Sequence, residues 1–243
     1  MHIPNGVLDP TTMVAAGAAS AGALTWSVHE LRQGRPRMGL ALGGAGGLLV
    51  AHLADIPLYG PYTAHLIGGT LLAIAIGPWL ALATMASVLT LEAFLLNDGG
   101  TAALGANVLV MGVVGVLVGY GAYRAIVVLG ARLYRGPSGP SLWTTASAAA
   151  LGAWLSVMAS ALTLASLVAI GGVTTIATVN GTPEATIVDL LPRYAAWGLL
   201  EAVLTGAAVA AGLAWSRSVA RLESAAEASR RATASASQVR LNS

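Results

Sequence analysis

Long apolar stretches, separated by short segments that carry most of the charge, dominate this sequence. Stretches such as Ala103–Val128 and Ser141–Ile170 are longer than the roughly 20 apolar residues that a helix needs to cross a lipid bilayer. Only 9% of the residues are charged and 56% are hydrophobic, whereas soluble domains carry about 25% charged residues. We therefore expect an all-α, polytopic membrane protein without a large water-soluble domain.

Seven transmembrane helices are predicted from the apolar stretches. They cover approximately residues 12–29, 38–53, 63–76, 79–96, 103–128, 141–170 and 191–215. The second and third are short, and short spans are tolerated where protein shields them from lipid. Residues 1–215 are accordingly expected to form one transmembrane domain, and residues 216–243 a cytoplasmic tail that begins as a short helix and ends in a disordered Ser-rich segment.

The arginines predict how the spans are oriented. Basic residues follow the first, fifth and seventh spans, whereas the N-terminus and segments 54–62, 97–101 and 171–189 contain neither Lys nor Arg. Arg193, at the start of the last span, is the exception. Because cytoplasmic loops are enriched in Lys and Arg, the N-terminus is expected outside and the C-terminus in the cytoplasm of a multi-pass cell-membrane protein. This use of the arginines leaves no indication of nucleic-acid binding.

The residue types available restrict the possible chemistry. Cysteine is absent, which excludes disulfides, thiolate metal sites and cysteine nucleophiles. The four histidines are therefore the main nitrogen donors that a metal could use. No GxxxxGK[ST] phosphate-binding loop occurs, so any ATP hydrolysis is expected to reside in separate subunits.

The N-terminal sequence MHIPNGVLDP predicts a metal chelate. Its first ten residues contain no Lys or Arg, unlike a cleavable signal peptide, so we expect this segment to be retained. Met1 is expected to survive because the bulky His2 after it disfavours removal of the initiator methionine. The Met1 amine, the His2 backbone nitrogen and the His2 imidazole Nδ1 can bind one metal through adjacent five- and six-membered rings. A further imidazole would complete a square-planar nitrogen set, which suits Ni(II) or Cu(II).

His65, in YGPYTAHLIGG, is the predicted fourth donor. It begins the third span on the same expected membrane face as Met1, and Gly68 and Gly69 allow close backbone approach by the N-terminal segment. Considered separately, His2 would more commonly be an exposed side chain and His65 an interfacial one. Their combination on one face, in a chain without thiols, favours a metal site.

Several motifs together resemble one family. MHIPNGVLDP, HLIGG, IGPW and LNDGGTAALGANVLVMGVVG occur in an order and spacing similar to those of the CbiM/NikM family. These are substrate-capture membrane subunits of energy-coupling-factor (ECF) nickel and cobalt transporters. The resemblance implies that Ni(II) or Co(II) is the transported substrate, bound by Met1, His2 and His65. It also implies an ECF transmembrane coupling subunit, ATPase subunits and a small accessory membrane subunit as partners, with no catalytic activity in this chain.

Four departures from the family pattern concern residues around the predicted ligands. Glu92 replaces a usual Gln, Val110 a second Asn, and Tyr194 a His, while PYTAH replaces Gly-Thr-Ser-Gly-His before the histidine. Groups that orient metal ligands tune the metal. We therefore expect the departures to affect the choice between nickel and cobalt more than metal binding itself.

Four further polar residues are candidates for supporting the ligands. Glu92 and Glu201 lie within predicted spans, where a carboxylate must be paired or face a polar cavity. Each either accepts an imidazole N–H near the metal or simply bonds between packed helices. Asp98 is expected to form a turn rather than bind metal, and Asn107 to hydrogen-bond the N-terminal segment or a neighbouring helix.

The other two histidines receive less weight. His29 precedes the cytoplasmic arginines and is expected at the interface, away from the chelate. His52 approaches the outer face, where it is either a transient ligand on the way into the site or, more commonly, a hydrogen-bonded helix-end residue. Two other functions remain open: an integral membrane enzyme that uses Glu92, His65 and Asp98, although no HExxH or GxSxG motif is present, and a metal sensor or assembly protein.

Overall fold

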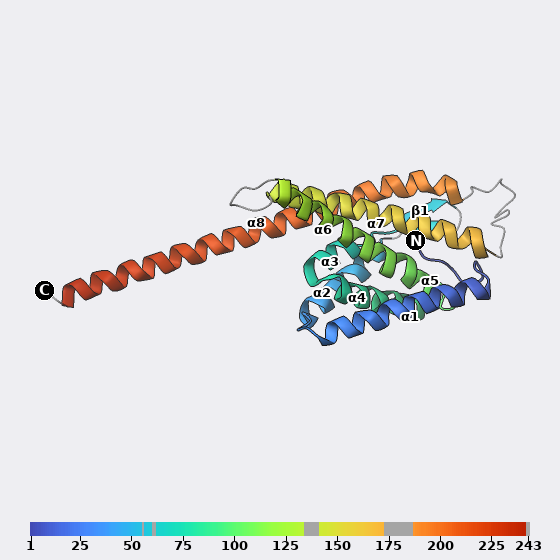
Figure 1. Cartoon of the computed structure of the whole chain (residues 1–243), viewed down its shortest axis with the longest axis horizontal. Coiled ribbons are helices and arrows are strands. Elements are labelled where there is room, and N and C mark those ends of the chain that lie inside the picture. The colour runs from blue at the N-terminus through green and yellow to red at the C-terminus, as the bar shows by residue number, and fades with distance from the viewer. Residues whose placement is uncertain (55, 60–61, 134–140, 173–186, 242–243) are drawn as a thin grey trace.

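The computed structural model of the chain describes residues 1–54, 56–59, 62–133, 141–172 and 187–241. The all-α class is confirmed for this part of the chain, apart from one short hairpin. The helices are α1 (Pro10–Arg32), α2 (Met38–His52), α3 (Gly69–Ile76), α4 (Pro78–Leu91), η1 (Glu92–Leu96), α5 (Leu104–Asn107), η2 (Val108–Gly115), α6 (Val116–Leu133), α7 (Leu142–Gly171) and α8 (Ile187–Leu241). Figure 1 shows the longer helices packed side by side, with the end of α8 extending beyond the bundle.

The hairpin lies between α2 and α3. Its strands, β1 (Ile56–Tyr59) and β2 (Tyr62–Ala64), are antiparallel, with Ile56 opposite Ala64. Because a hairpin reverses the chain, it returns the residues after β2 toward the end of α2.

The N-terminal segment is fixed where it enters α1. The Asp9 side chain accepts hydrogen bonds from the backbone N–H groups of Thr11 and Thr12 at 2.8 and 3.0 Å, which caps the helix, and Pro10 occupies its first turn. The Asp9 backbone N–H also donates to the Gly171 carbonyl at 2.6 Å. This backbone bond attaches the start of α1 to the end of α7.

Four helical segments of the described chain are long and apolar enough to cross a membrane. They are Pro78–Leu96, Leu104–Leu133, Leu142–Gly171 and Leu191–Glu227, and they coincide with the fourth to seventh predicted spans. Helices α1 and α2 coincide with the first and second predicted spans, but α2 has only 15 residues. The protein is therefore a multi-pass membrane protein, as predicted.

The third predicted span, residues 63–76, is wrong as a single helix. Its first residues belong to β2 and an extended segment, and only the eight residues of α3 are helical. Gly68 precedes α3 with φ +67° and Gly77 ends it with φ +88°, backbone conformations that glycine adopts at little cost. Eight residues of helix span about 12 Å, far less than the roughly 30 Å of a bilayer core.

The predicted tail is helical well beyond residue 215. Helix α8 runs without interruption to Leu241, through the boundary expected between residues 215 and 216. The structure describes helix as far as Leu241, where the sequence analysis expected a helix followed by a disordered segment; the cytoplasmic tail stays a prediction. The residues of α8 after the bundle include Glu223 and Glu227, both of which are exposed.

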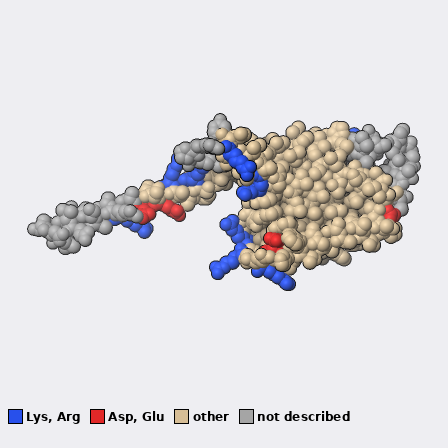
Figure 2. Space-filling model, in the orientation of Figure 1, with Lys and Arg blue, Asp and Glu red and all other residues tan. Residues whose placement is uncertain are grey.

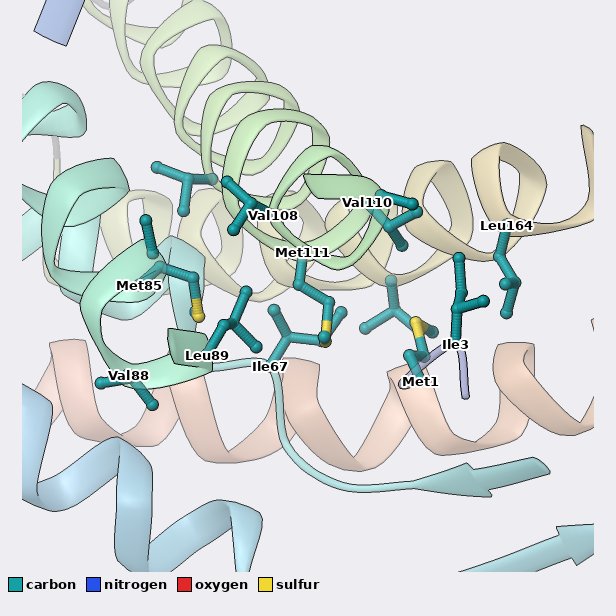
Figure 3. Close-up of a cluster of buried hydrophobic side chains, with 14 of the residues drawn as sticks. Met1, Ile3, Ile67, Met85, Val88, Leu89, Val108, Val110, Met111 and Leu164 are labelled. Carbon is teal, nitrogen blue, oxygen red and sulfur yellow. The ribbon is translucent and has the colours of Figure 1, made fainter. Parts of the chain in front are cut away.

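The N-terminal residues belong to the hydrophobic core rather than to the surface. Met1 and Ile3 are 2% and 1% exposed and join a cluster that includes Ile67 and Met111. Figure 3 shows Met1 and Ile3 among the side chains of this cluster. The first residues are thus held as firmly as a core strand would be, which places the chain terminus inside the bundle.

Candidate metal centre

Hydrogen bonds hold the N-terminal segment against the segment that follows η1. The Ile3 N–H donates to the Asn107 Oδ1 at 2.7 Å, and the Asn107 Nδ2 donates back to the Ile3 carbonyl at 3.2 Å. The Gly100 N–H donates to the same carbonyl at 2.9 Å. Nearer the surface, the Ala102 N–H donates to the Asn5 Oδ1 at 2.9 Å. The predicted bond between Asn107 and the N-terminal segment is confirmed.

Glycine is required where the two segments meet. A Cβ on Gly100 would lie 2.5 Å from both the backbone nitrogen and the Oδ1 of Asn5. Gly99 has φ +78°, and a Cβ there would lie 3.2 Å from the His2 ring. The Asp98-Gly99-Gly100 turn therefore lets the backbone approach His2 closely, which explains a motif that sequence reasoning assigned only to turn formation.

His65 lies in the extended segment between β2 and α3 and is 1% exposed. The Trp197 indole N–H donates to the His65 carbonyl at 2.9 Å. Glu201 accepts hydrogen bonds from the Ile67 and Gly68 backbone N–H groups, each at 2.8 Å. Helix α8 thus positions His65 through its backbone, and the described contacts of Glu201 are to this segment rather than to a histidine ring.

Three buried imidazoles converge beside the N-terminus. The His2 and His65 rings stack with centroids 4.8 Å apart, and the His52 centroid lies 4.1 Å from that of His65. One nitrogen from each ring lies within 4.8 Å of the corresponding nitrogens of the other two. The structure therefore brings His2 and His65 together, and adds His52, to which sequence reasoning gave little weight.

Two carboxylates border the three rings. The Glu92 Oε1 lies 2.7 Å from the His52 Nδ1, and its Oε2 lies 3.4 Å from the His2 Nε2. The Asp98 Oδ1 lies 3.0 Å from the His2 Nδ1. Glu92 thus accepts an imidazole N–H, one of the two roles considered for it, although the imidazole is that of His52. Asp98 contacts the nitrogen that the chelate would use, so metal binding there requires this contact to open.

The charges around the site act on the pKa values of its polar groups. Burial by itself would lower the pKa of His2, but the contacts with Asp98 and Glu92 outweigh it and raise that pKa above 6.5. The contact with His2 lowers the pKa of Asp98. Both shifts favour a charged contact between His2 and Asp98, which a metal on the His2 Nδ1 has to displace.

The donor set suits a divalent transition metal. Among the described side chains, the Nε2 atoms of His52 and His65 are buried without a hydrogen-bond partner. The two ring nitrogens of His2 face the Asp98 and Glu92 carboxylates. Buried polar atoms are seldom left unpaired, and imidazole nitrogens are preferred ligands of nickel, cobalt and zinc. The N-terminal amine of Met1 is close enough to affect the pKa of His2.

The remaining candidates lie outside this cluster. His29 is exposed near the end of α1, where its Nε2 lies 2.9 Å from the Gln33 Nε2, as expected of an interfacial histidine. Val110 and Tyr194 are buried in the hydrophobic core. The structure thus brings Glu92, Asp98 and Asn107 to the N-terminal segment, while Glu201 acts on the backbone after His65.

Comparisons with known proteins agree on one family. The family described as "Cobalt uptake substrate-specific transmembrane region" (CbiM) matches residues 2–217. A putative fused nickel transport protein NikMN of Archaeoglobus fulgidus is 40% identical over 126 residues, which are 52% of this chain and 42% of that protein. A cobalt transport protein CbiM of Desulforamulus reducens is 36% identical over 130 residues, 52% of each chain.

A solved structure shows the same fold. A crystal structure of a transition metal transporter superposes with a TM-score of 0.69 at 30% identity, covering 86% of this chain and 91% of that one. The chain spans about half the length of the curated relatives that it matches. Members of the family are transport proteins rather than enzymes. Because the family match extends over most of its length, this multi-pass membrane protein belongs to the CbiM family of cobalt-uptake transmembrane proteins.

Proposed function

We propose that the chain captures Ni(II) or Co(II) at the outer face of the cell membrane for uptake by an ECF-type importer. The observation that carries this proposal is the cluster of three buried imidazoles beside the docked N-terminus, in which the Nε2 atoms of His52 and His65 have no hydrogen-bond partner. The names of the relatives, which refer to nickel and cobalt transport, support the same substrate class.

The cation is bound by four nitrogens in this proposal. The Met1 amine, the His2 backbone nitrogen and the His2 Nδ1 form the two fused chelate rings, and the His65 Nε2 supplies the fourth donor. Asn107 and Gly100 hold the N-terminal segment in the position that the chelate needs. Glu201 holds the segment that carries His65. Glu92 and Asp98 lie beside the imidazoles, where their negative charge compensates that of the cation.

The arginines support an outward-facing site. Figure 2 shows Arg side chains gathered at one end of the bundle. At that end, the Arg37 Nη1 donates to the Ala75 carbonyl near the end of α3 at 3.5 Å. His65 lies before the start of the same helix. By the positive-inside rule the arginine end is cytoplasmic, so the metal site lies toward the outside.

This orientation is compatible with seven crossings and an outside N-terminus. The third crossing would consist of β2, the extended segment with His65, and α3. Non-helical backbone is tolerated at membrane depth where protein buries it, and Ala64, His65 and Ile67 are at most 1% exposed. Because the third crossing changes from a strand to a short helix, its backbone and side-chain groups can face a central site.

The importer requires partners in this proposal. Separate ATPase subunits and a transmembrane coupling subunit would supply and transmit the energy of ATP hydrolysis, with a small accessory membrane subunit completing the complex. Movement of the N-terminal segment away from His65 would separate the amine and His2 from the fourth ligand. Because three of the four donors belong to that segment, its displacement releases the cation.

Metal titration of the purified protein in detergent tests the proposal. We expect Ni(II) or Co(II) to bind the wild type and to bind at least 10-fold more weakly to His2→Ala, to His65→Ala and to a form with one residue added before Met1. His29→Ala is the matched control and should bind as the wild type does. Wild-type affinity in all three altered proteins would refute the proposal. Metal accumulation by cells with and without the coupling subunits distinguishes capture for uptake from sensing.

A further inference from the structure

His52 ends α2 with one ring nitrogen bonded and the other free to bind a ligand. The side chain is 2% exposed, and its Nδ1 lies 2.7 Å from the Glu92 Oε1. Its Nε2 is buried without a hydrogen-bond partner. This is the helix-end histidine that the sequence predicted, but only half of its hydrogen-bonding capacity is used.

The contact with Glu92 determines which nitrogen can bind a metal. A carboxylate accepts a hydrogen bond from the Nδ1–H, so the neutral ring carries its lone pair on Nε2. A histidine ligand that donates its other N–H to a carboxylate is a frequent arrangement in metal sites, because the carboxylate fixes the tautomer and the ring orientation. Glu92 therefore prepares His52 for coordination through Nε2.

The position of the His52 ring fits a shared cation. One of its ring nitrogens lies within 4.8 Å of a ring nitrogen of His2 and of one of His65. Ligand nitrogens around a metal at 2.0–2.1 Å are roughly 2.9 Å apart when adjacent and roughly 4.2 Å apart when opposite, so the three rings move closer together when they bind a cation. The His52 ring is inclined at 70° to that of His2 and at 49° to that of His65, which are inclined at only 23° to each other. The His52 ring thus lies in a different plane from the other two.

We propose that the His52 Nε2 is an additional ligand of the transported cation, positioned by Glu92. The inference rests on the proposed function and deepens it, because it raises the number of protein nitrogens from four to five. Four coplanar nitrogens suit square-planar Ni(II), whereas a fifth ligand at an angle suits a cation of higher coordination number. A site with five nitrogens therefore favours Co(II) over Ni(II) more than a site with only four nitrogens would.

A purely structural pair of His52 and Glu92 would leave two observations without a cause. It needs only one ring nitrogen, yet the second is also buried. It also gives no reason for three imidazoles to share one buried space, where each loses its hydration. A bound cation supplies a partner for the Nε2 atoms of both His52 and His65.

X-ray absorption spectroscopy of the Co(II)-loaded full-length protein tests the proposal, because multiple scattering counts the coordinated imidazoles. We expect three in the wild type and two in His52→Gln, whose amide can still bond Glu92. Titration should show at least 10-fold weaker Co(II) binding by His52→Gln and a smaller loss for Ni(II). His29→Gln makes the same chemical change at an exposed site and should match the wild type in both measurements.

The outcomes separate this inference from the proposed function. Two imidazoles in the wild type, or Co(II) binding by His52→Gln within twofold of the wild type, would overturn the role of His52. Such results together with strong losses in His2→Ala and His65→Ala would leave the capture function intact. No Co(II) or Ni(II) binding by the folded wild type would instead overturn the capture function. The wild-type count remains decisive if His52→Gln does not fold.

Discussion

Replacing Asn107 with alanine should detach the N-terminal segment from the metal site. The side chain of Asn107 is 2% exposed and makes two hydrogen bonds to the backbone of Ile3. Its removal leaves the Ile3 N–H buried without a partner, whereas the Ile3 carbonyl keeps its bond from Gly100. An orphaned buried donor costs about 1–3 kcal/mol.

A central value of about 2 kcal/mol corresponds to roughly 30-fold in an equilibrium constant. Metal affinity falls in proportion to the population of the docked segment once docking becomes the limiting equilibrium. We therefore expect Asn107→Ala to bind Ni(II) and Co(II) about 30-fold more weakly, measured by calorimetric titration of the purified protein in detergent.

Asn5→Ala is the matched control, because the side-chain oxygen of Asn5 bonds the Ala102 N–H at the exposed edge of the same two segments. Water replaces that bond at little cost, so the affinity should change by no more than about threefold, that is by less than 1 kcal/mol. Binding by Asn107→Ala as tight as that of Asn5→Ala would refute the reasoning that the docked segment is required for the metal site.

Three further perturbations follow from the same geometry. Gly100→Ala places a Cβ 2.5 Å from Asn5 and should weaken metal binding at least 10-fold, while Gly121→Ala, where the Cβ meets nothing within 4 Å, should leave the affinity unchanged in the same titration. Glu201→Gln replaces one of two acceptor oxygens with a donor, so one of the Ile67 and Gly68 N–H groups loses its bond. The free energy of unfolding should fall by about 1–3 kcal/mol. An unchanged melting temperature would contradict this role of Glu201. Metal affinity should fall as pH decreases, because protons compete for the His2 ring, whose pKa is raised above 6.5, and for the N-terminal amine, whose reference pKa is about 8. Asp98→Asn removes one cause of the raised pKa of His2 and should move the decline in metal affinity to lower pH. A wild-type affinity that stays constant between pH 5 and pH 8 would contradict the assignment of nitrogen ligands.

The sequence was sufficient to predict that His2, His65 and Asn107 lie close together, but not that His52 lies beside them. His2 and His65 could be paired because the apolar spans and the arginines place both on one membrane face. Asn107 could be linked to the N-terminal segment because a buried amide needs a partner. These predictions depend only on residue type and side of the membrane, which a single sequence carries.

The position of His52 beside the other two rings depends on a hairpin that hydropathy does not reveal. Residues 63–76 are apolar enough to be interpreted as a helix, but β1 and β2 pair Ile56 with Ala64 and return the chain toward the end of α2. The useful signal was the presence of two histidines, His52 and His65, on either side of a segment expected at the same face. Glu92 lies within a long apolar helix, so the partner that it contacts depended on tertiary packing.

The structure was also needed to tell which of the carboxylates within the helices contacts the histidine rings. Glu92 and Glu201 have the same sequence context, a single carboxylate within an apolar helix. In the structure Glu92 contacts two histidine rings, whereas Glu201 accepts two backbone hydrogen bonds from Ile67 and Gly68. The two roles differ because tertiary packing brings different groups beside each carboxylate, which a single sequence does not reveal.

A metal-loaded structure tests the central claim most directly. Crystals of the full chain grown with Ni(II) or Co(II), with diffraction recorded at the absorption edge of the metal, would locate the cation by its anomalous signal. We expect one peak bonded to the Met1 amine, to His2 and to the His65 Nε2, at about the 2.0–2.1 Å typical of metal–imidazole bonds. A peak away from the N-terminal segment, or one that His65 does not reach, would contradict the account.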